Sequence, residues 1–368
     1  MVIHIEIGLP HSTNRQATVT LAPEEIRSIS LSVASAGQRN RTGLYMRRHP
    51  KPQDAAAGIV VDPNKPFRSP QEPRKLTIPQ HLELLGSGAL APAHPVINGP
   101  ERYQTRHAML AVPVSDLVSN LLRPCFSVQG FGSHRTFFLE DEPIESKTYW
   151  AACYFVNGAD QPVLSFRDVK FEPRRDRILS LDGADLVAEG LQWAVALVPL
   201  VKNAEPLGAA EIAKNDYDLR QIFGRDAEAE ITAAYDHWHE GWDEAVGGLV
   251  ARHLAAARPF EVFYHSVLAI HRSGAIRIHQ LDSDLPGIAR SLAADGIVAA
   301  GLLDSGGSCA LYDPWLGGYW NHAWYYREPR GAILLFELKA SERIPEARPG
   351  SWYHARTAED NPALRRNS

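Results

Sequence analysis

The sequence has few cysteines and no long apolar run, and both absences narrow the classes of protein to which it can belong. Its three cysteines, Cys125, Cys153 and Cys309, are too few for a disulfide framework, and none forms the C-x-x-C pair of a zinc ribbon. No apolar run approaches the ~20 residues that a membrane-spanning helix needs. The first residues alternate like a strand and lack the basic and apolar regions of a signal peptide. We therefore expect reduced thiols, no spanning helix and a cytoplasmic location.

The chain also lacks an excess of positive charge. Its 38 Lys and Arg against 43 Asp and Glu give a formal net charge of −5 at pH 7. This balance offers neither the basic surface that binds nucleic acid nor a polybasic membrane patch. The G-x-S-x-G, Walker and G-x-G-x-x-G motifs are absent, which leaves serine-hydrolase, P-loop and dinucleotide-binding interpretations without support. We expect no cofactor, no metal, no nucleic acid and no membrane partner, and leave a homo-oligomer open.

The remaining composition is that of a globular protein whose segments differ in character. With 368 residues, 45% of them hydrophobic, the chain can bury a large core. Residues 38–100 are rich in Pro, which excludes central strands and long helices there. We divide the chain into a β-rich and Pro-rich extension (1–104), a main domain (105–340) and a polar tail (341–368). Within the main domain, apolar residues at helical spacing predict a helical insertion at 209–257.

The most informative stretch lies near the end of the main domain. Residues 297–303 form an apolar run typical of a buried strand, and 331–338 form another. Directly after the first run comes Asp304-Ser-Gly-Gly-Ser308. An acidic residue thus follows a strand and precedes glycines and hydroxyl residues, whose backbone and side-chain donors can surround a ligand. We interpret the segment as a cradle for an anionic or sugar ligand.

This stretch resembles a hallmark of the phosphodiester glycosidase family. In that family a strand ends in Asp-Gly-Gly-Gly-Ser-Ser and is followed by a second strand, an Asn-containing loop and a closing strand. Here the order is Asp304-Ser-Gly-Gly-Ser-Cys309, the strand 310–313, then Asn321 and Arg327, and the strand 332–338. The resemblance implies an α+β fold with a mixed β-sheet and flanking helices. It also implies a hydrolase that cleaves a sugar-1-phosphodiester or a related phosphorylated glycoside.

Two further stretches are similar to motifs of the same family. One runs from Trp150 to Val163 and includes Tyr154 and Asn157. The other is 191–203, which by propensity alone fits a strand or a helix, and which the resemblance makes a strand.

A hairpin is indicated by alternating residues on either side of Arg272-Ser-Gly274. The family has Arg-Thr where this chain has His265-Ser266. With a two-residue loop, His265 pairs with Asp282, whose carboxylate would favour a charged imidazolium. Such a cation would hold phosphate in place of the family's Arg. After the hairpin, Asp284 predicts the start of a crossover helix.

These motifs define a set of candidate site residues. A departing phosphate monoester is already a good leaving group, so the enzyme mainly has to stabilise the cationic sugar ring, position water and hold phosphate. The catalytic candidates are Asp304 and His265. The substrate-binding candidates are Ser305, Gly306, Gly307, Ser308, Asn321, Arg327, Tyr154 and Asn157. The expected partner is a phosphorylated sugar or a nucleotide-like small molecule.

Several alternatives stay open from the sequence. Substitutions within the hallmark motifs also fit a catalytically diverged binding or biosynthetic tailoring protein. Asp304 could merely cap its own turn, and His265 could be a satisfied core histidine. A thiol nucleophile, Cys153 or Cys309 with His265 as base, is a further alternative. The glycosidase interpretation requires Asp304 to face an open, donor-lined hollow shared with His265.

Overall fold

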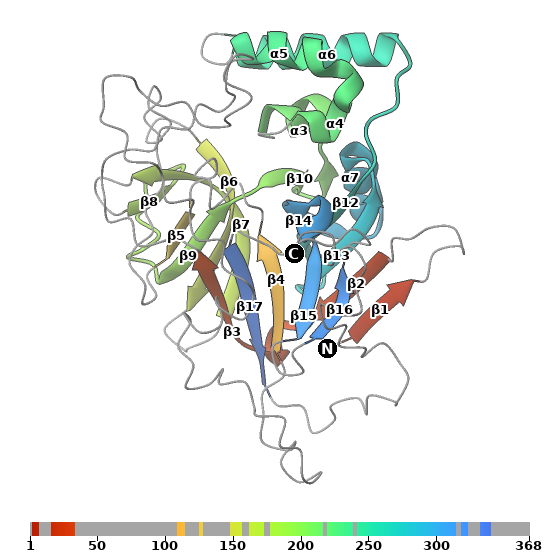
Figure 1. Cartoon of the computed structure of the whole chain (residues 1–368). Coiled ribbons are helices and arrows are strands. Elements are labelled where there is room, and N and C mark those ends of the chain that lie inside the picture. Colours follow the sequence, from red (N-terminus) through yellow and green to blue (C-terminus); the bar gives the residue numbers. More distant parts are fainter. Residues whose placement is uncertain are drawn as a thin grey trace, which may run out of the picture.

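The structure consists of three β-sheets and a group of helices that packs against one of them (Figure 1). It is a computed structural model that describes residues 2–6, 16–33, 109–114, 125–127, 148–156, 162–172, 177–215, 219–237, 241–313, 318–322 and 332–339. The combination of sheets and separate helices confirms the predicted α+β class.

The largest sheet, sheet A, has seven strands. In spatial order they are β1 (Val2–Glu6), β2 (Gln16–Leu21), β13 (Ile276–Ser283), β12 (Phe263–His271), β14 (Ile297–Ser305), β10 (Val198–Lys202) and β11 (Glu205–Pro206). β12 lies at the centre of the sheet, between β13 and β14.

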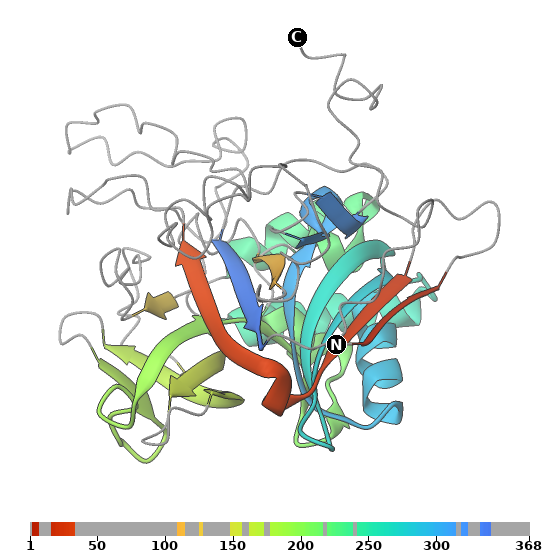
Figure 2. The ribbon, with the colours of Figure 1, turned by 90° about the horizontal axis from the view of Figure 1, so that it is seen from below.

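The other two sheets have five strands each. Sheet B contains β16 (Gly318–His322), β15 (Ala310–Asp313), β4 (Met109–Val114), β17 (Ala332–Leu338) and β3 (Ile26–Val33). Sheet C contains β5 (Cys125–Ser127), β9 (Leu191–Ala196), β6 (Thr148–Val156), β7 (Pro162–Glu172) and β8 (Arg177–Ser180). Figure 2 shows sheet A and sheet C on either side of β3 and β17.

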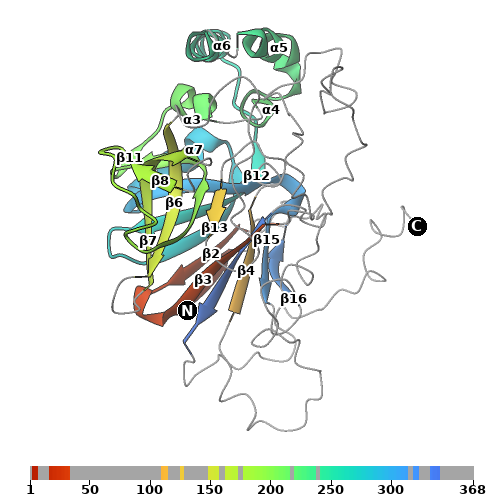
Figure 3. The same ribbon diagram turned by 90° about the vertical axis from the view of Figure 1, so that its left-hand side faces the viewer.

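The helices form one group above sheet A. They are α3 (Ala209–Asn215), α4 (Arg220–Phe223), α5 (Glu228–Asp236), α6 (Trp242–Ala255) and α7 (Leu285–Ala294), with short 3-10 turns η1 (Pro23–Glu25), η5 (Arg225–Ala227) and η6 (Gly306–Ser308). In Figure 3, α5 and α6 lie at the end of the molecule, farther from the strands than α7.

Sheet A lies between two apolar layers, because its residues alternate between its faces. Val267 and Ala269 of β12 face the helices and share a core with them. Leu268 of β12 and Ile278 of β13 face the opposite way, into a core shared with sheets B and C. The side of the sheet on which a β12 residue lies therefore decides which core it enters.

Several parts of the fold differ from the sequence-based expectations. All strand pairs between the described strands are antiparallel, where a mixed sheet was expected. Part of the expected N-terminal extension belongs to the main sheets, since β2 pairs with β13 and β3 pairs with β17.

Other parts of the fold agree with the expectations. The stretch 191–203, which propensity left ambiguous, contains the strands β9 and β10. Residues 209–257, expected to be helical, contain α3 to α6. Among the helices of the described ranges, none is long and apolar enough to cross a membrane.

The helix expected after the hairpin is α7, and its start shows why the sequence predicts it. The Asp284 side chain accepts a hydrogen bond from the Gly287 backbone N–H at 2.7 Å, and Pro286 occupies the first turn. This bond satisfies one of the N–H groups that a helix start leaves without an intrahelical partner. The chain then leaves the helix through Gly296, whose φ of 80° favours glycine. α7 connects β13 to β14 on one face of sheet A.

We expect the Asp284→Ala variant to lower the free energy of unfolding by about 1 kcal/mol, because it removes this N-cap bond. Urea unfolding at neutral pH measures the change. Glu244→Ala, which removes an exposed acidic residue in the first turn of α6, is the matched control and should change stability by only a few tenths of a kcal/mol. Equal effects of the two variants would show that the loss does not come from the cap.

Candidate active site

A β-bulge at the end of β14 decides which way Asp304 faces. Val267 of β12 pairs with Leu302, whereas the preceding residue, Ser266, pairs with Asp304, so Leu303 is an extra residue in β14. A bulge of this kind puts two residues of one strand opposite one residue of its partner. Residues that pair directly lie on the same face of a sheet. Asp304 therefore lies on the face of Ser266, towards sheet B.

His265 lies on the other face of sheet A. It pairs with Ser305, and its Nδ1 atom is 2.7 Å from the Ser305 Oγ atom. Asp304 is also buried, with 4% of its surface exposed. The expectation of an open hollow shared by Asp304 and His265 is therefore wrong. The physical reason is the bulge, because regular pairing from Val267 onward would have placed Asp304 opposite His265.

Asp304 instead belongs to a row of polar side chains that crosses three neighbouring strands. Gln280 of β13 pairs with Ser266 of β12, which pairs with Asp304 of β14, and all three residues are buried. Neighbouring strands lie about 4.8 Å apart, so an amide, a hydroxyl and a carboxylate follow one another within the reach of one small ligand. We call these three residues the polar row.

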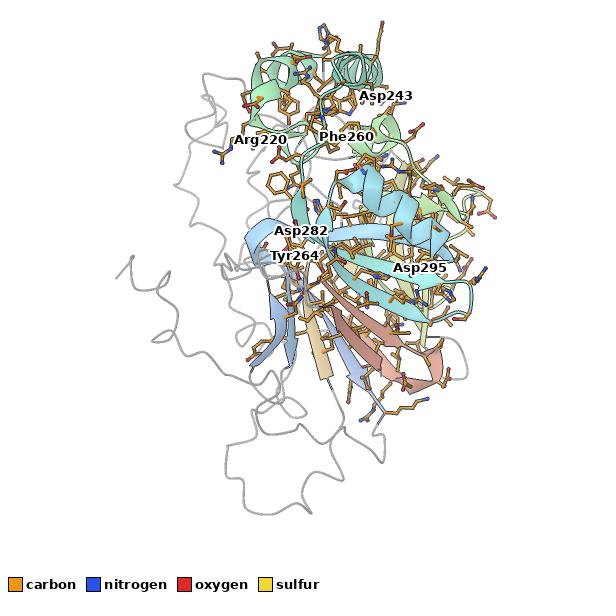
Figure 4. All side chains as sticks on the ribbon, turned by 90° about the vertical axis from the view of Figure 1, so that its right-hand side faces the viewer. Arg220, Asp243, Phe260, Tyr264, Asp282 and Asp295 are labelled. Carbon is orange, nitrogen blue, oxygen red and sulfur yellow. The ribbon has the colours of Figure 1, made fainter. Side chains whose placement is uncertain are left out.

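Two residues tie the polar row to sheet B. The Asn321 Nδ2 group of β16 donates to the Tyr264 hydroxyl at 2.6 Å and to Gln280 Oε1 at 2.9 Å. The Tyr264 hydroxyl also donates to Gln280 Oε1 at 3.3 Å. Figure 4 labels Tyr264 together with Asp282, its partner on β13. The candidate site thus lies where the chain passes from sheet A into sheet B.

The hydrogen bonding of this site is incomplete among the residues that the structure describes. The Ser266 hydroxyl, the Gln280 Nε2 group and the Ser308 hydroxyl are buried and have no partner there. A buried polar group without a partner costs about 1–3 kcal/mol, so proteins seldom keep several together without a ligand or water. The unmet groups are two hydroxyls and an amide, which are the groups that bind sugar hydroxyls and amides.

His265 does not carry the charge that was expected of it. It pairs with Leu281, while Asp282 pairs with Tyr264, so the predicted contact between His265 and Asp282 is wrong. The hairpin loop has three residues, because the His271 N–H donates to the Ala275 carbonyl at 2.9 Å, and Gly274 adopts a φ of 85°. Burial lowers the pKa of the His265 imidazole to about 3, against a smaller raising effect of the Ser283 backbone. The ring is therefore neutral at physiological pH and cannot hold phosphate as a cation.

The predicted cradle is the turn η6. Asp304 Oδ1 accepts a hydrogen bond from the N–H of the next residue, Ser305, at 2.8 Å, whereas the N-cap of the turn is Ser305, whose side chain forms no capping bond among the described residues. Gly306 has a φ of 81°, and the Cys309 N–H donates to its carbonyl at 3.2 Å. Gly307 and Ser308 are buried, whereas Ser305 and Gly306 are partly exposed. The turn thus follows directly on Asp304, whose carboxylate is held by the Ser305 N–H.

We expect Gly306→Ala to destabilise the protein by about 1–2 kcal/mol, because a Cβ atom disfavours the left-handed backbone that this position adopts. Gly247→Ala is the matched control, since a Cβ added there in α6 meets nothing within 4 Å and alanine favours a helix. That variant should stabilise the protein by up to about 1 kcal/mol. Thermal unfolding compares the two, and a neutral Gly306→Ala variant would contradict the expected strain.

The remaining sequence candidates divide into two groups. Tyr154 is 2% exposed and stacks on Trp193 with ring centroids 5.6 Å apart, so it is a core residue and its assignment to substrate binding is wrong. The physical reason is that its side of β6 faces the apolar core shared by the three sheets. Asn157 and Arg327 lie outside the described residues.

The cysteines give no support to a thiol nucleophile. Burial raises the pKa of the Cys153 thiol to about 12, which keeps it protonated at neutral pH. Cys309 is fully buried, and its Sγ atom lies 3.5 Å from the Tyr264 carbonyl oxygen, to which it donates. Within the described ranges, no three His, Cys, Asp or Glu side chains come together in a way that would hold a metal ion.

Three residues of the site, Tyr264, Ser266 and Gln280, were not predicted from the sequence. Tyr264 and Ser266 flank His265 and therefore lie on the opposite face of β12 from it. Gln280 was visible as a polar residue in an otherwise apolar strand segment, which is a signal because a buried amide needs partners. Its contact with Asn321 is not visible in the sequence, because 41 residues separate them.

Comparisons with known proteins add little to this geometry. No protein-family model matches the chain, and no curated protein does so significantly. Among solved structures, the catalytic domain of zebrafish N-acetylglucosamine-1-phosphodiester alpha-N-acetylglucosaminidase, auto-inhibited by its pro-peptide, is similar at a TM-score of 0.39 and 12% identity. That match covers 92% of this chain and 82% of the other. A hypothetical protein from Synechocystis is similar at a TM-score of 0.36 and 11% identity, over 90% of this chain and 61% of the other. Values this low leave the function to be argued from the site itself.

Proposed function

We propose that this protein is a hydrolase that cleaves a sugar-1-phosphodiester or a related phosphorylated glycoside, with Asp304 as its catalytic carboxylate. The observation that carries the proposal is the polar row, in which the Ser266 hydroxyl and the Gln280 Nε2 group, both buried and without a partner among the described residues, lie in line with Asp304. A core position for such groups destabilises the fold, so their retention supports a role in binding. The Asp-Ser-Gly-Gly-Ser motif, which begins at the end of β14, supports the same class of substrate.

The chemistry assigns a separate task to each group. Departure of a phosphate monoester needs little general-acid help, so the main demand is to stabilise positive charge on the sugar ring. The Asp304 carboxylate would supply that stabilisation or would orient the attacking water. Ser266, Gln280 and Asn321 would bind sugar hydroxyl or amide groups. The Ser308 hydroxyl and the backbone N–H groups of η6 would bind the phosphate oxygens.

His265 has a different role in this proposal from the one that the sequence suggested. Its neutral, buried ring holds Ser305, so it is a positioning residue and does not touch the phosphate. The proposed partner remains a phosphorylated sugar or nucleotide-like small molecule, and a cytoplasmic location remains part of the proposal.

The proposal is tested by incubating the purified full chain with UDP-N-acetylglucosamine and with simpler sugar-1-phosphodiesters. Release of free sugar, followed by chromatography, is the expected result, and it should require an intact Asp304. A folded protein that releases no sugar from any of these compounds would contradict the proposal. Folding is verified by circular dichroism on the same samples.

A second candidate function is that of a catalytically diverged binding or biosynthetic tailoring protein. The burial of Asp304, 4% exposed, together with its hydrogen bond to the Ser305 N–H, favours this alternative. In that case, calorimetry should detect binding of a sugar phosphodiester that the protein does not cleave.

A further inference from the structure

Two hydrogen bonds hold the oxygen of the Gln280 side chain. The Asn321 Nδ2 group donates to Gln280 Oε1 at 2.9 Å, and the Tyr264 hydroxyl donates to the same oxygen at 3.3 Å. Asn321 Nδ2 also donates to the Tyr264 hydroxyl at 2.6 Å, which links the two donors to each other. Tyr264 lies on β12 of sheet A and Asn321 on β16 of sheet B, so both sheets hold the Gln280 oxygen. That oxygen is therefore occupied within the protein.

The Asn321 nitrogen decides how the Gln280 amide is turned. An amide nitrogen only donates, so the Gln280 atom that faces Asn321 Nδ2 has to be the oxygen. Turning the Gln280 amide alone would direct two donors at each other. The Gln280 nitrogen, Nε2, is therefore the group left for another partner. It is buried and has no partner among the residues that the structure describes.

The polar row places this donor at a defined distance from Asp304. Gln280 pairs with Ser266, which pairs with Asp304, so Gln280 and Asp304 lie on the same face of sheet A, two strands apart. With about 4.8 Å between neighbouring strands, their backbones are about 10 Å apart. A group bound by Gln280 therefore belongs to a part of the ligand away from the bond on which Asp304 acts. Because Nε2 only donates, the ligand atom that it binds has to be an acceptor oxygen.

We propose that Asn321 is a positioning residue that fixes the Gln280 amide, so that Gln280 Nε2 donates to an acceptor oxygen of the sugar away from the cleaved bond. The proposal rests on the proposed function for the identity of the ligand as a sugar. Asn321 Nδ2 carries two hydrogens, and both are donated within the protein, to Tyr264 and to Gln280. This nitrogen has no hydrogen left for a ligand, so Asn321 acts on the ligand through Gln280.

The orientation of the two amides is tested on the wild-type chain by neutron diffraction from crystals exchanged into D2O, because deuterons distinguish an amide nitrogen from an amide oxygen. The expected result is that a deuteron on Asn321 points at Gln280, and that the deuterons on Gln280 point away from Asn321. The opposite orientation of both amides would overturn the proposal, since Gln280 would then present an acceptor. This measurement needs neither a ligand nor activity, so its outcome is independent of the proposed function.

The Asn321→Asp variant tests whether the amide orientation affects the ligand. A carboxylate only accepts, so it would turn the Gln280 nitrogen towards itself and leave the Gln280 oxygen facing the ligand. With UDP-N-acetylglucosamine as substrate, we expect KM to rise at least about 10-fold and kcat to fall less than about threefold, because the lost contact lies away from the cleaved bond. Asn215→Asp on α3, where Nδ2 donates to the Glu211 carbonyl at 2.8 Å, is the matched control and should change neither value.

The Gln280→Met variant removes the same donor without adding a charge to the core, so it provides the test where Asn321→Asp does not fold. We expect calorimetry to show that methyl N-acetyl-α-glucosaminide binds about 3- to 10-fold more weakly, the value of one hydrogen bond. Wild-type affinity in a folded variant of either kind would overturn the proposal. A wild-type chain that binds this glycoside and hydrolyses no phosphodiester overturns the proposed function alone, whereas one that binds neither the glycoside nor UDP-N-acetylglucosamine overturns both.

Discussion

The Asp304→Asn variant is expected to cleave sugar-1-phosphodiesters with a kcat about 10²- to 10³-fold lower than that of the wild type. Asparagine has the shape of aspartate and keeps an oxygen that can accept the Ser305 N–H, which Asp304 Oδ1 accepts at 2.8 Å. The substitution therefore removes the negative charge while the turn η6 is retained. Because the charge acts on the cationic transition state, kcat should fall far more than KM rises.

Stability separates this interpretation from a structural role for Asp304. The free energy of unfolding of Asp304→Asn should stay within about 1 kcal/mol of the wild-type value, because the hydrogen bond from the Ser305 N–H is preserved. Asp295→Asn is a matched control at the end of α7, where the Asp295 side chain is 68% exposed and paired with Arg277 (Figure 4). It should change neither kcat nor stability appreciably. An Asp304→Asn variant that unfolds readily, or that keeps full activity, would show that the carboxylate only supports the turn.

Lowering the pH from 7.5 to 5 is expected to destabilise the protein by about 4 kcal/mol through two buried histidines. Burial lowers the pKa from 6.5 to about 3 at His265 and to about 4 at His279. Both rings are neutral in the folded state, whereas the unfolded chain binds protons below pH 6.5. The contribution of the two histidines to the free energy of unfolding is therefore fully present above pH 6.5, and it is lost as the pH falls towards their folded-state pKa values. Each histidine contributes about 2 kcal/mol at pH 5, since one pKa unit corresponds to about 1.4 kcal/mol.

The neighbours of His279 identify the control for this prediction. Its Nδ1 atom lies 3.0 Å from the Thr18 Oγ1 atom, and Arg277 further lowers its pKa while Asp295 raises it. His279→Asn places an amide near the Nδ1 position and cannot titrate, so it should halve the loss between pH 7.5 and 5. Urea unfolding at several pH values measures the slope. A stability that is independent of pH over this range would show that the two rings are accessible to protons in the folded protein.

Local patterns in the sequence determined much of the fold. Apolar runs predicted β14 and β17, and alternating residues on either side of a turn predicted β12 and β13, because buried strands and strands with one buried face show these patterns. Asp284 marked the start of α7, because a capping bond depends on neighbouring residues alone. The position of Asp304 at the end of a buried strand, before glycines and hydroxyl residues, was predicted from the local sequence as well.

Only the tertiary structure decided the composition of the site. One extra residue, Leu303, moves Asp304 away from His265 and towards Ser266, and a bulge depends on the partner strand. The three-residue hairpin loop separates His265 from Asp282, and Asn321 meets Gln280 through the contact between two sheets. A shift of one residue reverses the face of every side chain that follows, and pairing between distant strands sets that shift. The chemical groups were therefore visible in the sequence, whereas the face on which each one lies was not.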